Sequence, residues 1–329
     1  MNNIQIGILG YGNLGRGVEL AISQQPDMEL TAIFTRRNPA EIQPSLSGVP
    51  IYNVKDVLNF KNSIDVMILC GGSSTDLDSQ SPAFASHFNI VDSFDTHPEI
   101  PRHFKSVNTS ALLTNHTAIV SAGWDPGLFS INRLLAESIL PLGHSYTFWG
   151  KGVSQGHSDA LRRIEGVANA IQYTIPLESA MEAVRRGDGP AFTPRQMHTR
   201  ECYVALLPDA DPDTVRDQIV HMPSYFADYD TTVHFVSQEE LQENHYAMPH
   251  GGFIQRSGTT GSDQENCHIY EFSLKLDSNP QFTANVLACY ARSAYRLAAE
   301  GSYGAKTVLE IPPAYLSSRS IEQLRAEIL

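Results

Sequence analysis

The sequence predicts an α/β protein that combines a Rossmann-type, doubly wound nucleotide domain with a second α+β domain. An apolar strand at residues 4–9 leads into a glycine pattern at residues 10–15, and a helical run follows at residues 16–25. Short apolar runs bounded by turn residues continue as far as Pro126, which is typical of buried parallel strands. A chain of 329 residues is also long enough for two domains.

The glycine pattern, GYGNLG, has the spacing of a dinucleotide-binding turn. Gly10 permits a tight turn, Gly12 lets the backbone approach a pyrophosphate, and Gly15 lets the helix pack closely on the strand. The helix N-terminus adds amide donors and a partial positive charge. The same pattern also occurs as structural glycine alone. Its place between a strand and a helix favours a dinucleotide site.

The end of the second strand, residues 29–34, indicates which dinucleotide binds. NAD-binding proteins usually place an acidic residue there, about 20 residues past the glycines, to hold the ribose 2′-hydroxyl. This chain has Thr35, Arg36 and Arg37 instead. Guanidinium groups bind a dianionic 2′-phosphate through paired, charge-assisted hydrogen bonds. The alternative is a solvated basic loop. We expect NADP.

Two carboxylates follow strands of the expected sheet. Strands are predicted at residues 65–70, 89–92 and 117–121, with Asp95 after the second of these and Asp125 after the third. Ligands of such sheets lie beyond the carboxyl ends of the strands. Either residue alone could be a turn or helix-capping Asp. Together, on neighbouring strand ends, they suit a catalytic pair beside a nicotinamide.

Composition excludes several other classes of protein. The net charge of −13 argues against binding to nucleic acid or to an anionic membrane surface. No apolar run approaches the roughly 20 residues that span a bilayer, and no signal segment precedes the first strand. The four cysteines lack paired spacing, so we expect free thiols and no zinc site. These features predict a cytoplasmic oxidoreductase.

The second half loses the regular alternation of strand and helix. A helix is expected at residues 129–140, and a second one, capped by Ser158, is expected to continue through Ile171. Alternating patterns predict strands of one mixed sheet, followed by a long helix at residues 282–300; the strands are at residues 171–175, 201–207, 231–236 and 268–276. We expect a discontinuous nucleotide domain (1–125 and about 280–329) and a substrate-binding and dimerisation domain (126–279).

Polar clusters in the second half are candidates for a substrate site. The Gly-containing loop at residues 154–159 could bind a carboxylate through its amides, or could only cap a helix. Arg200 could clamp a second carboxylate or lie on the surface. His250, between a proline and two glycines, is expected in a rigid turn. A metal site with His245 is not favoured, because no further ligand has suitable spacing.

Longer strings resemble the meso-diaminopimelate D-dehydrogenase family. The resemblance runs from Ile4 to Ile311 through GYGNLGRGVE, TRR, SFD, AGWDPGLFSINR, HSYTFWGKGVSQGHSDALRRI, MPHGG and LKLDSNPQFTA. Of these, GWDPG and SQGHSDALRRI are far more specific than the glycine pattern. The resemblance implies an NADP-dependent homodimer that oxidises the D-centre of meso-2,6-diaminopimelate to L-2-amino-6-oxopimelate and ammonia. It also implies the reverse amination, in lysine biosynthesis.

The resemblance also implies site residues. Asp95 and Asp125 are the candidate catalytic residues and would contact both cofactor and substrate. The other cofactor positions are Tyr11, Gly12, Asn13, Leu14, Thr35, Arg36, Arg37, Cys70, Gly71, Gly72, Ser73, Ser93, Phe94, Ala122, Gly123, Trp124 and Pro126. The other substrate positions are Trp149, Gln155, Gly156, Asp159, Thr174, Arg200, His250 and Asn279.

Two departures from the family pattern and two alternative functions remain. Ala122 stands where the family often has Thr or Ser, and residues 38–50 form a longer segment than expected. Another NADP-dependent reductase of amino-acid metabolism would need a histidine-rich catalytic stretch or a well-placed Lys–Asp pair, and the sequence offers neither. A non-enzymatic NADP sensor would have no reason to keep two carboxylate-binding sites.

Overall fold

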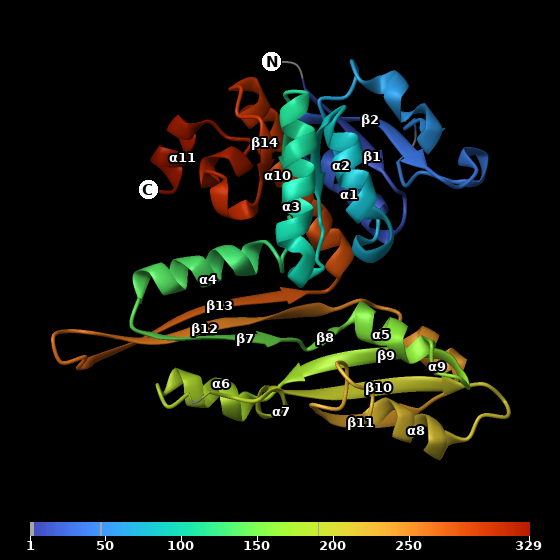
Figure 1. Ribbon diagram of the computed structural model, residues 1–329, viewed down its shortest axis with the longest axis vertical. Coiled ribbons are helices and arrows are strands. Elements are labelled where there is room, and N and C mark those ends of the chain that lie inside the picture. The colour runs from blue at the N-terminus through green and yellow to red at the C-terminus, as the bar shows by residue number, and fades with distance from the viewer. Residues whose placement is uncertain (1–2, 47, 190) are drawn as a thin grey trace. The chain divides into compact units, whose positions relative to one another are not determined.

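The chain divides into two compact units in a computed structural model that describes residues 3–46, 48–189 and 191–329. The first unit runs to Ile131 and resumes at Pro280, and the second comprises Asn132–Asn279 (Figure 1). The boundary falls inside helix α4 (Leu128–Ile139). None of the described helices is both long and apolar enough to cross a membrane.

The first unit is built on a seven-stranded sheet with the order β14-β6-β5-β4-β1-β2-β3. Every neighbouring pair in it is parallel. The strands are β1 (Ile4–Leu9), β2 (Met28–Thr35), β3 (Ile51–Asn53), β4 (Val66–Leu69), β5 (Asn89–Asp92), β6 (Thr117–Ile119) and β14 (Gly304–Lys306). The five strands expected here and the predicted fold class are confirmed. The two edge strands, each three residues long, were not predicted.

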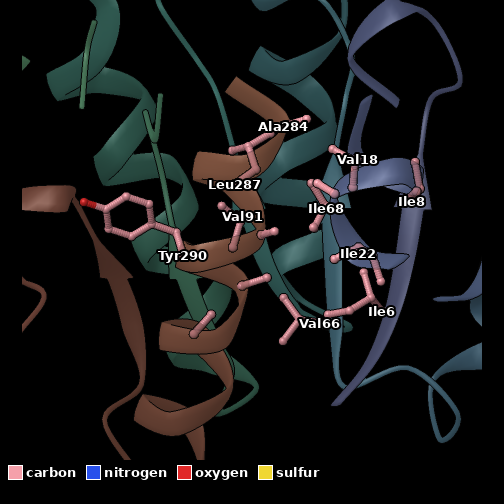
Figure 2. Close-up of a cluster of buried hydrophobic side chains, with 14 of the residues drawn as sticks. Ile6, Ile8, Val18, Ile22, Val66, Ile68, Val91, Ala284, Leu287 and Tyr290 are labelled. Carbon is pink, nitrogen blue, oxygen red and sulfur yellow. The ribbon is translucent and has the colours of Figure 1, made fainter. Parts of the chain in front are cut away.

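Helices cover both faces of this sheet: α1 (Asn13–Ser23), α2 (Asp78–Ala85), α3 (Ile100–Leu113) and α10 (Asn279–Ala299). Helices α1 and α10 pack on the same face as Ile6, Ile8 and Ile68 (Figure 2). Helices α2 and α3 pack on the other face, against Met67 and Leu69. Successive strand side chains point to opposite faces, so a strand covered on both sides is apolar throughout.

The C-terminal tail belongs to the first unit. Strand β14 pairs with β6, and Arg292 of α10, which is buried, holds the tail through the carbonyl of Leu316. The same guanidinium forms a bidentate ion pair with Asp27 at 2.7 and 2.6 Å. The chain ends in helix α11 (Ile321–Glu327).

The second unit contains two sheets instead of the single mixed sheet predicted. One has the order β11-β10-β9-β8 and the other β13-β12-β7. The strands are β7 (Gly143–Trp149), β8 (Gly152–Val153), β9 (Val167–Pro176), β10 (His198–Leu206), β11 (Asp230–Phe235), β12 (His250–Thr260) and β13 (Asn266–Leu276). Its shorter helices are α5 (Gln155–Arg162), α6 (Glu178–Arg185), α7 (Pro194–Met197), α8 (Pro212–Val220) and α9 (Gln238–Asn244).

The helix expected to continue through Ile171 is wrong. Helix α5 ends at Arg162, Gly166 adopts a φ of +88°, and β9 begins at the next residue. The cap is also misplaced, because Ser154 occupies the N-cap position. Ser158 lies within the helix, where its hydroxyl donates to the Ser154 carbonyl and accepts from the Gln172 amide. Apolar residues that fit a 3.6-residue period therefore belong to two elements.

The rigid turn expected around His250 is also wrong. His250 is the first residue of the eleven-residue strand β12, and Gly251 and Gly252 lie in the same strand. Their φ values of +143° and +157° and their close approach to neighbouring backbone explain why glycine occurs there. A glycine pair that signals a turn in most sequences here permits tight strand pairing.

Candidate functional site

The glycine turn forms a cradle of the kind that a pyrophosphate needs. Gly10 has a φ of +97°, and a side chain on Gly15 would clash with the Gly10 carbonyl. A Cβ on Gly12 would meet nothing within 4 Å, so the backbone is open on that side. Helix α1 begins at Asn13 without a side-chain cap and without an acidic residue in its first turn, which leaves its amide donors available for an anion.

The two arginines after β2 lie beside this turn. The Arg37 guanidinium donates to the Tyr11 carbonyl, and its amide donates to the buried Thr35 hydroxyl at 3.1 Å. Arg36 is 70% exposed and pairs with Asp76 at 2.7 Å. Two cations therefore lie beside the glycine turn, and guanidinium groups are suited to binding a 2′-phosphate.

A buried carboxylate anchors the longer segment that follows these arginines. Glu19 of α1 accepts hydrogen bonds from the Tyr11 hydroxyl and from the amides of Ser45 and Leu46, the latter at 3.0 and 2.8 Å. Burial, followed by the hydrogen bond to Glu19, raises the pKa of Tyr11. The Arg16 guanidinium stacks over the Tyr11 ring at 4.6 Å. Residues 45 and 46 are thereby tied to the glycine turn.

The turn after β4 lies against the first glycine turn. A Cβ on Gly10 would approach Cys70 at 3.3 Å, and one on Gly71 would approach Asp76 at 2.6 Å. Ser73 begins a short π-helical segment, Ser73–Leu77, and its hydroxyl accepts from the Asp95 amide at 3.0 Å. Burial raises the pKa of the Cys70 thiol, which disfavours the nucleophilic thiolate form.

The loops after β5 and β6 carry the two candidate catalytic carboxylates. Asp95 is exposed and Asp125 is half-buried. The Ala122 amide donates to the Asp92 carbonyl at 2.9 Å, so the two loops are joined where the strands end. Ser93 and the buried Phe94 precede Asp95, and the buried Gly123 and Trp124 precede Asp125-Pro126. Ala122 is fully buried, and because its side chain is a methyl group it offers no hydroxyl at this position.

In the second unit, two predicted substrate residues, Thr174 and Arg200, lie in one row across a sheet. The register pairs Gly152 of β8 with Thr174 of β9, and Thr174 with Arg200 of β10. The Arg200 guanidinium donates to the Thr174 hydroxyl. A Cβ on Gly152 would lie 2.6 Å from the His250 Cα, so His250 packs directly over this row.

Arg200 is a buried charge in this unit. Its side chain is only 6% exposed, and its guanidinium lies 3.9 Å from the centre of the Tyr229 ring. Within the described ranges, no carboxylate forms an ion pair with it, and its Nε has no hydrogen-bond partner. Burial lowers the pKa of Arg200. A buried cation without a counter-ion is costly unless a ligand supplies one.

Two further polar atoms near Arg200 are buried without a partner among the described residues. They are Gln172 Oε1 and Thr231 Oγ1. Thr231 pairs with Arg200 across β10 and β11, and Gln172 donates through Nε2 to the Thr174 hydroxyl at 3.3 Å. Buried polar groups in native proteins are nearly always satisfied. A polar ligand at this place would satisfy these atoms.

Neutral histidines flank Arg200. Burial, followed by the Arg200 charge, lowers the pKa of both His157 and His198 to about 4. His198 Nε2 accepts from the Trp149 amide at 2.9 Å, and the two rings stack at 5.7 Å. The unprotonated Nε2 fixes the tautomer with the proton on Nδ1. These imidazoles add hydrogen-bonding capacity without adding positive charge.

The remaining predicted substrate residues lie in three places. Trp149 ends β7 and pairs with Gly252, and the Asn279 amide donates to the Met248 carbonyl at 3.0 Å, close in sequence to His250. Gly156 is exposed in the first turn of α5, and the Gln155 side chain lies outside the described part of the structure. Asp159 is exposed and forms an ion pair with Arg162 on the same helix.

Sequence reasoning missed Tyr229, His198 and Gln172. Tyr229 lies 29 residues from Arg200 in sequence and reaches it because β11, which follows Tyr229, pairs in parallel with β10. His198 and Gln172 occupy strand positions that read as ordinary alternation. No spacing signal marks them. All four cysteines are free, and no group of three metal-ligating side chains occurs among the described residues.

The fold and these two groups of residues define the class of protein: an oxidoreductase-type α/β unit with a dinucleotide turn, accompanied by a unit that holds a buried arginine without a described carboxylate partner. Residues 123–278 match the model of the diaminopimelic acid dehydrogenase C-terminal domain. A meso-diaminopimelate D-dehydrogenase of Acetivibrio thermocellus is 58% identical over all of this chain and 98% of its own length. The chain belongs to the meso-diaminopimelate D-dehydrogenase family.

Solved structures agree with this membership. The C. glutamicum DAP dehydrogenase in complex with DAP has a TM-score of 0.92 at 44% identity, covering 100% of both chains. An engineered D-amino acid dehydrogenase bound to NADP+ has a TM-score of 0.87 at 42% identity, also covering 100% of both chains.

Proposed function

We propose that this chain is an NADP-dependent enzyme that converts the D-centre of meso-2,6-diaminopimelate to a ketone, giving L-2-amino-6-oxopimelate. Water is consumed, ammonia and NADPH are released, and the reverse amination serves lysine biosynthesis. The observation that carries the proposal is Arg200, a buried cation without a described carboxylate partner. A substrate with two amino-acid ends can supply that carboxylate while its other end reacts. The family membership supports the same reaction.

The nucleotide unit supports NADP as the cofactor. The open backbone at Gly12 and the uncapped start of α1 suit the pyrophosphate, and Arg36 and Arg37 suit the 2′-phosphate. Bound NADP supplies the hydride acceptor. The chain's own residues bind and orient the substrate, so catalysis depends mainly on alignment.

The two ends of the substrate are assigned to different residues. Asp95 and Asp125, at the ends of neighbouring strands, hold the ammonium group of the D-centre. The first turn of α5, with Gln155 and Gly156, holds the adjacent carboxylate through amide groups. Thr174, Arg200 and His250 are assigned to the distant amino-acid end, and Trp149 and Asn279 are assigned as further substrate contacts. Asp159 is assigned as a further substrate contact.

A stereoisomer panel tests this function. Purified protein is assayed for NADPH formation at 340 nm with meso-, L,L- and D,D-diaminopimelate, each with NADP or NAD. We expect turnover of the meso isomer with NADP, no turnover of the L,L isomer, and a much slower reaction with NAD. Binding of NADP without turnover of any isomer would indicate a sensor, and turnover of an unrelated carbonyl substrate alone would indicate another reductase.

We also propose a homodimer in the cytoplasm. Leu134, Leu135 and Ile139 of α4 and the following Leu142 are each at least 46% exposed, which is a large apolar surface for a lone chain. Free cysteines suit a reducing compartment. Light scattering is expected to give twice the 36.3 kDa chain mass, and Leu135→Glu is expected to yield monomer. A monomeric parent protein would contradict the dimer.

A further inference from the structure

Asp92, a residue outside the candidate site, connects the two loops that carry Asp95 and Asp125. It is the last residue of β5, is fully buried, and uses both carboxylate oxygens. Its Oδ1 accepts from the Phe94 amide at 3.1 Å and from the Ser121 amide at 2.8 Å. One oxygen therefore accepts hydrogen bonds from two different loops.

The second oxygen fixes the carboxylate itself. Asp92 Oδ2 accepts from the Ser81 hydroxyl of α2 at 2.6 Å and lies 2.9 Å from His103 Nε2 of α3. The His103 ring, also fully buried, stacks on the Phe94 ring with centroids 3.9 Å apart and an interplanar angle of 5°. Two helices thus set the orientation of the carboxylate that the loops use.

The loop after β6 adopts a backbone conformation that needs support. Ser121 has a φ of +57°, which is uncommon for a residue with a side chain. Its amide is the one bound to Asp92 Oδ1, and the next amide, of Ala122, is bound to the Asp92 carbonyl. Such conformations are unfavourable and cluster at functional sites, where the surroundings hold them in place.

We infer that Asp92 is a positioning residue: its Oδ1 fixes the Phe94–Asp95 loop and the Ser121–Ala122 loop so that Asp95 and Asp125 are placed before substrate arrives. Asp95 is further held by the hydrogen bond that its backbone amide donates to the Ser73 hydroxyl. The inference rests on the proposed function, because it assigns these carboxylates to the reacting end. Displacements of about 1 Å in such groups can cost about 100-fold in rate.

Substitutions at Asp92 separate positioning from general stability. Asp92→Ala removes the acceptor, and its kcat for meso-diaminopimelate is expected to fall about 100-fold, while the NADP dissociation constant changes less than about threefold. Asp92→Asn keeps an acceptor at Oδ1, and its amide can donate to Ser81 Oγ and to the other tautomer of His103. Its kcat is expected within about fivefold of the parent protein.

Ser81→Ala is the matched control. It removes one hydrogen bond from the same carboxylate but leaves both loop amides bonded, so it is expected to lower the melting temperature with little change in kcat. Deuterium exchange in the substrate-free protein gives a readout independent of activity. Exchange at residues 93–96 and 121–123 is expected to rise in Asp92→Ala and to stay near the parent level in Asp92→Asn and Ser81→Ala.

Several results would overturn the inference. Asp92→Ala with parental kcat and parental loop exchange would make Asp92 a purely structural residue, and equal loss in Asp92→Asn would show that charge matters and the Oδ1 acceptor does not. If Asp92→Ala does not fold, Asp92→Leu, which fills the vacated space without an acceptor, carries the test; faster loop exchange and a lower kcat are expected, and parental values would refute the inference. A parent protein that does not turn over meso-diaminopimelate would contradict the proposed function. Deuterium exchange in the two loops would still test the role of Asp92.

Discussion

Replacing Arg200 with Met removes the buried cation that we assign to the distant substrate carboxylate. The guanidinium contacts Thr174 and the Tyr229 ring and is only 6% exposed, whereas the methionine side chain has similar length and no charge. The substrate carboxylate would then enter a buried site without its partner.

The magnitude follows from that unpaired charge. Truncating one member of a buried charge pair costs about 2–5 kcal/mol, which corresponds to a rise of about 30- to 4,000-fold in the KM for meso-diaminopimelate. The substrate-free variant should melt no lower than the parent protein, because its folded state no longer buries an uncompensated charge. Weaker substrate binding without lower stability is the expected signature.

The assay is steady-state NADPH formation with meso-diaminopimelate and with a simple D-amino acid that has no distal carboxylate. The kcat/KM of Arg200→Met should fall with meso-diaminopimelate and should not fall with the simple D-amino acid. Arg195→Met is the matched control, since Arg195 is 54% exposed and pairs with Asp230 at 3.4 Å. An unchanged KM in Arg200→Met, or an equal rise in Arg195→Met, would refute the assignment.

Three further predictions concern the cofactor, a loop and pH. Arg36→Ala should raise the KM for NADP by about 10- to 100-fold with little effect on NAD, since hydrogen bonds between charged groups contribute about 1.5–3 kcal/mol; equal effects on both dinucleotides would contradict the 2′-phosphate role. Glu19→Ala should lower the unfolding free energy by about 1–3 kcal/mol in urea melts, because the Ser45 and Leu46 amides and the Tyr11 hydroxyl lose their acceptor; an unchanged midpoint would contradict this. Because the folded pKa of His198 is about 4 and its ordinary value is 6.5, the unfolded chain binds a proton that the folded chain does not, and stability should fall as pH drops through that window. The slope is at most about 1.4 kcal/mol per pH unit for this group, and His198→Gln, measured at about pH 7 and about pH 5, should flatten it; an identical slope in the variant would show that His198 is not responsible.

The parts of the fold that the sequence predicted are those where one local pattern fixes one element. Val66–Leu69 is apolar on both faces because helices cover both faces, and such a run is unambiguous between turn residues. The second unit depends on less local features. A helical pattern ends at Gly166 although the apolar residues after it keep the 3.6-residue period. Gly251 and Gly252 permit close strand pairing in place of a turn.

The candidate site shows the same limit. The glycine turn and the arginines after β2 are contiguous in sequence, so their spacing carries the interpretation. Tyr229 stacks on Arg200 only because β10 and β11 pair, and Asp92 reads as the last residue of a strand until its hydrogen bonds are seen. Contacts made across strands and loops cannot be found from periodicity alone.

The most direct test follows the hydrogen at the D-configured carbon. Parent protein is incubated with NADP and meso-diaminopimelate deuterated at that carbon, and the dinucleotide product is analysed by mass spectrometry. We expect one deuterium in NADPH and formation of the 2-amino-6-oxo product. Unlabelled NADPH, or no reduction of NADP at all, would contradict hydride transfer from the D-centre and with it the proposed function.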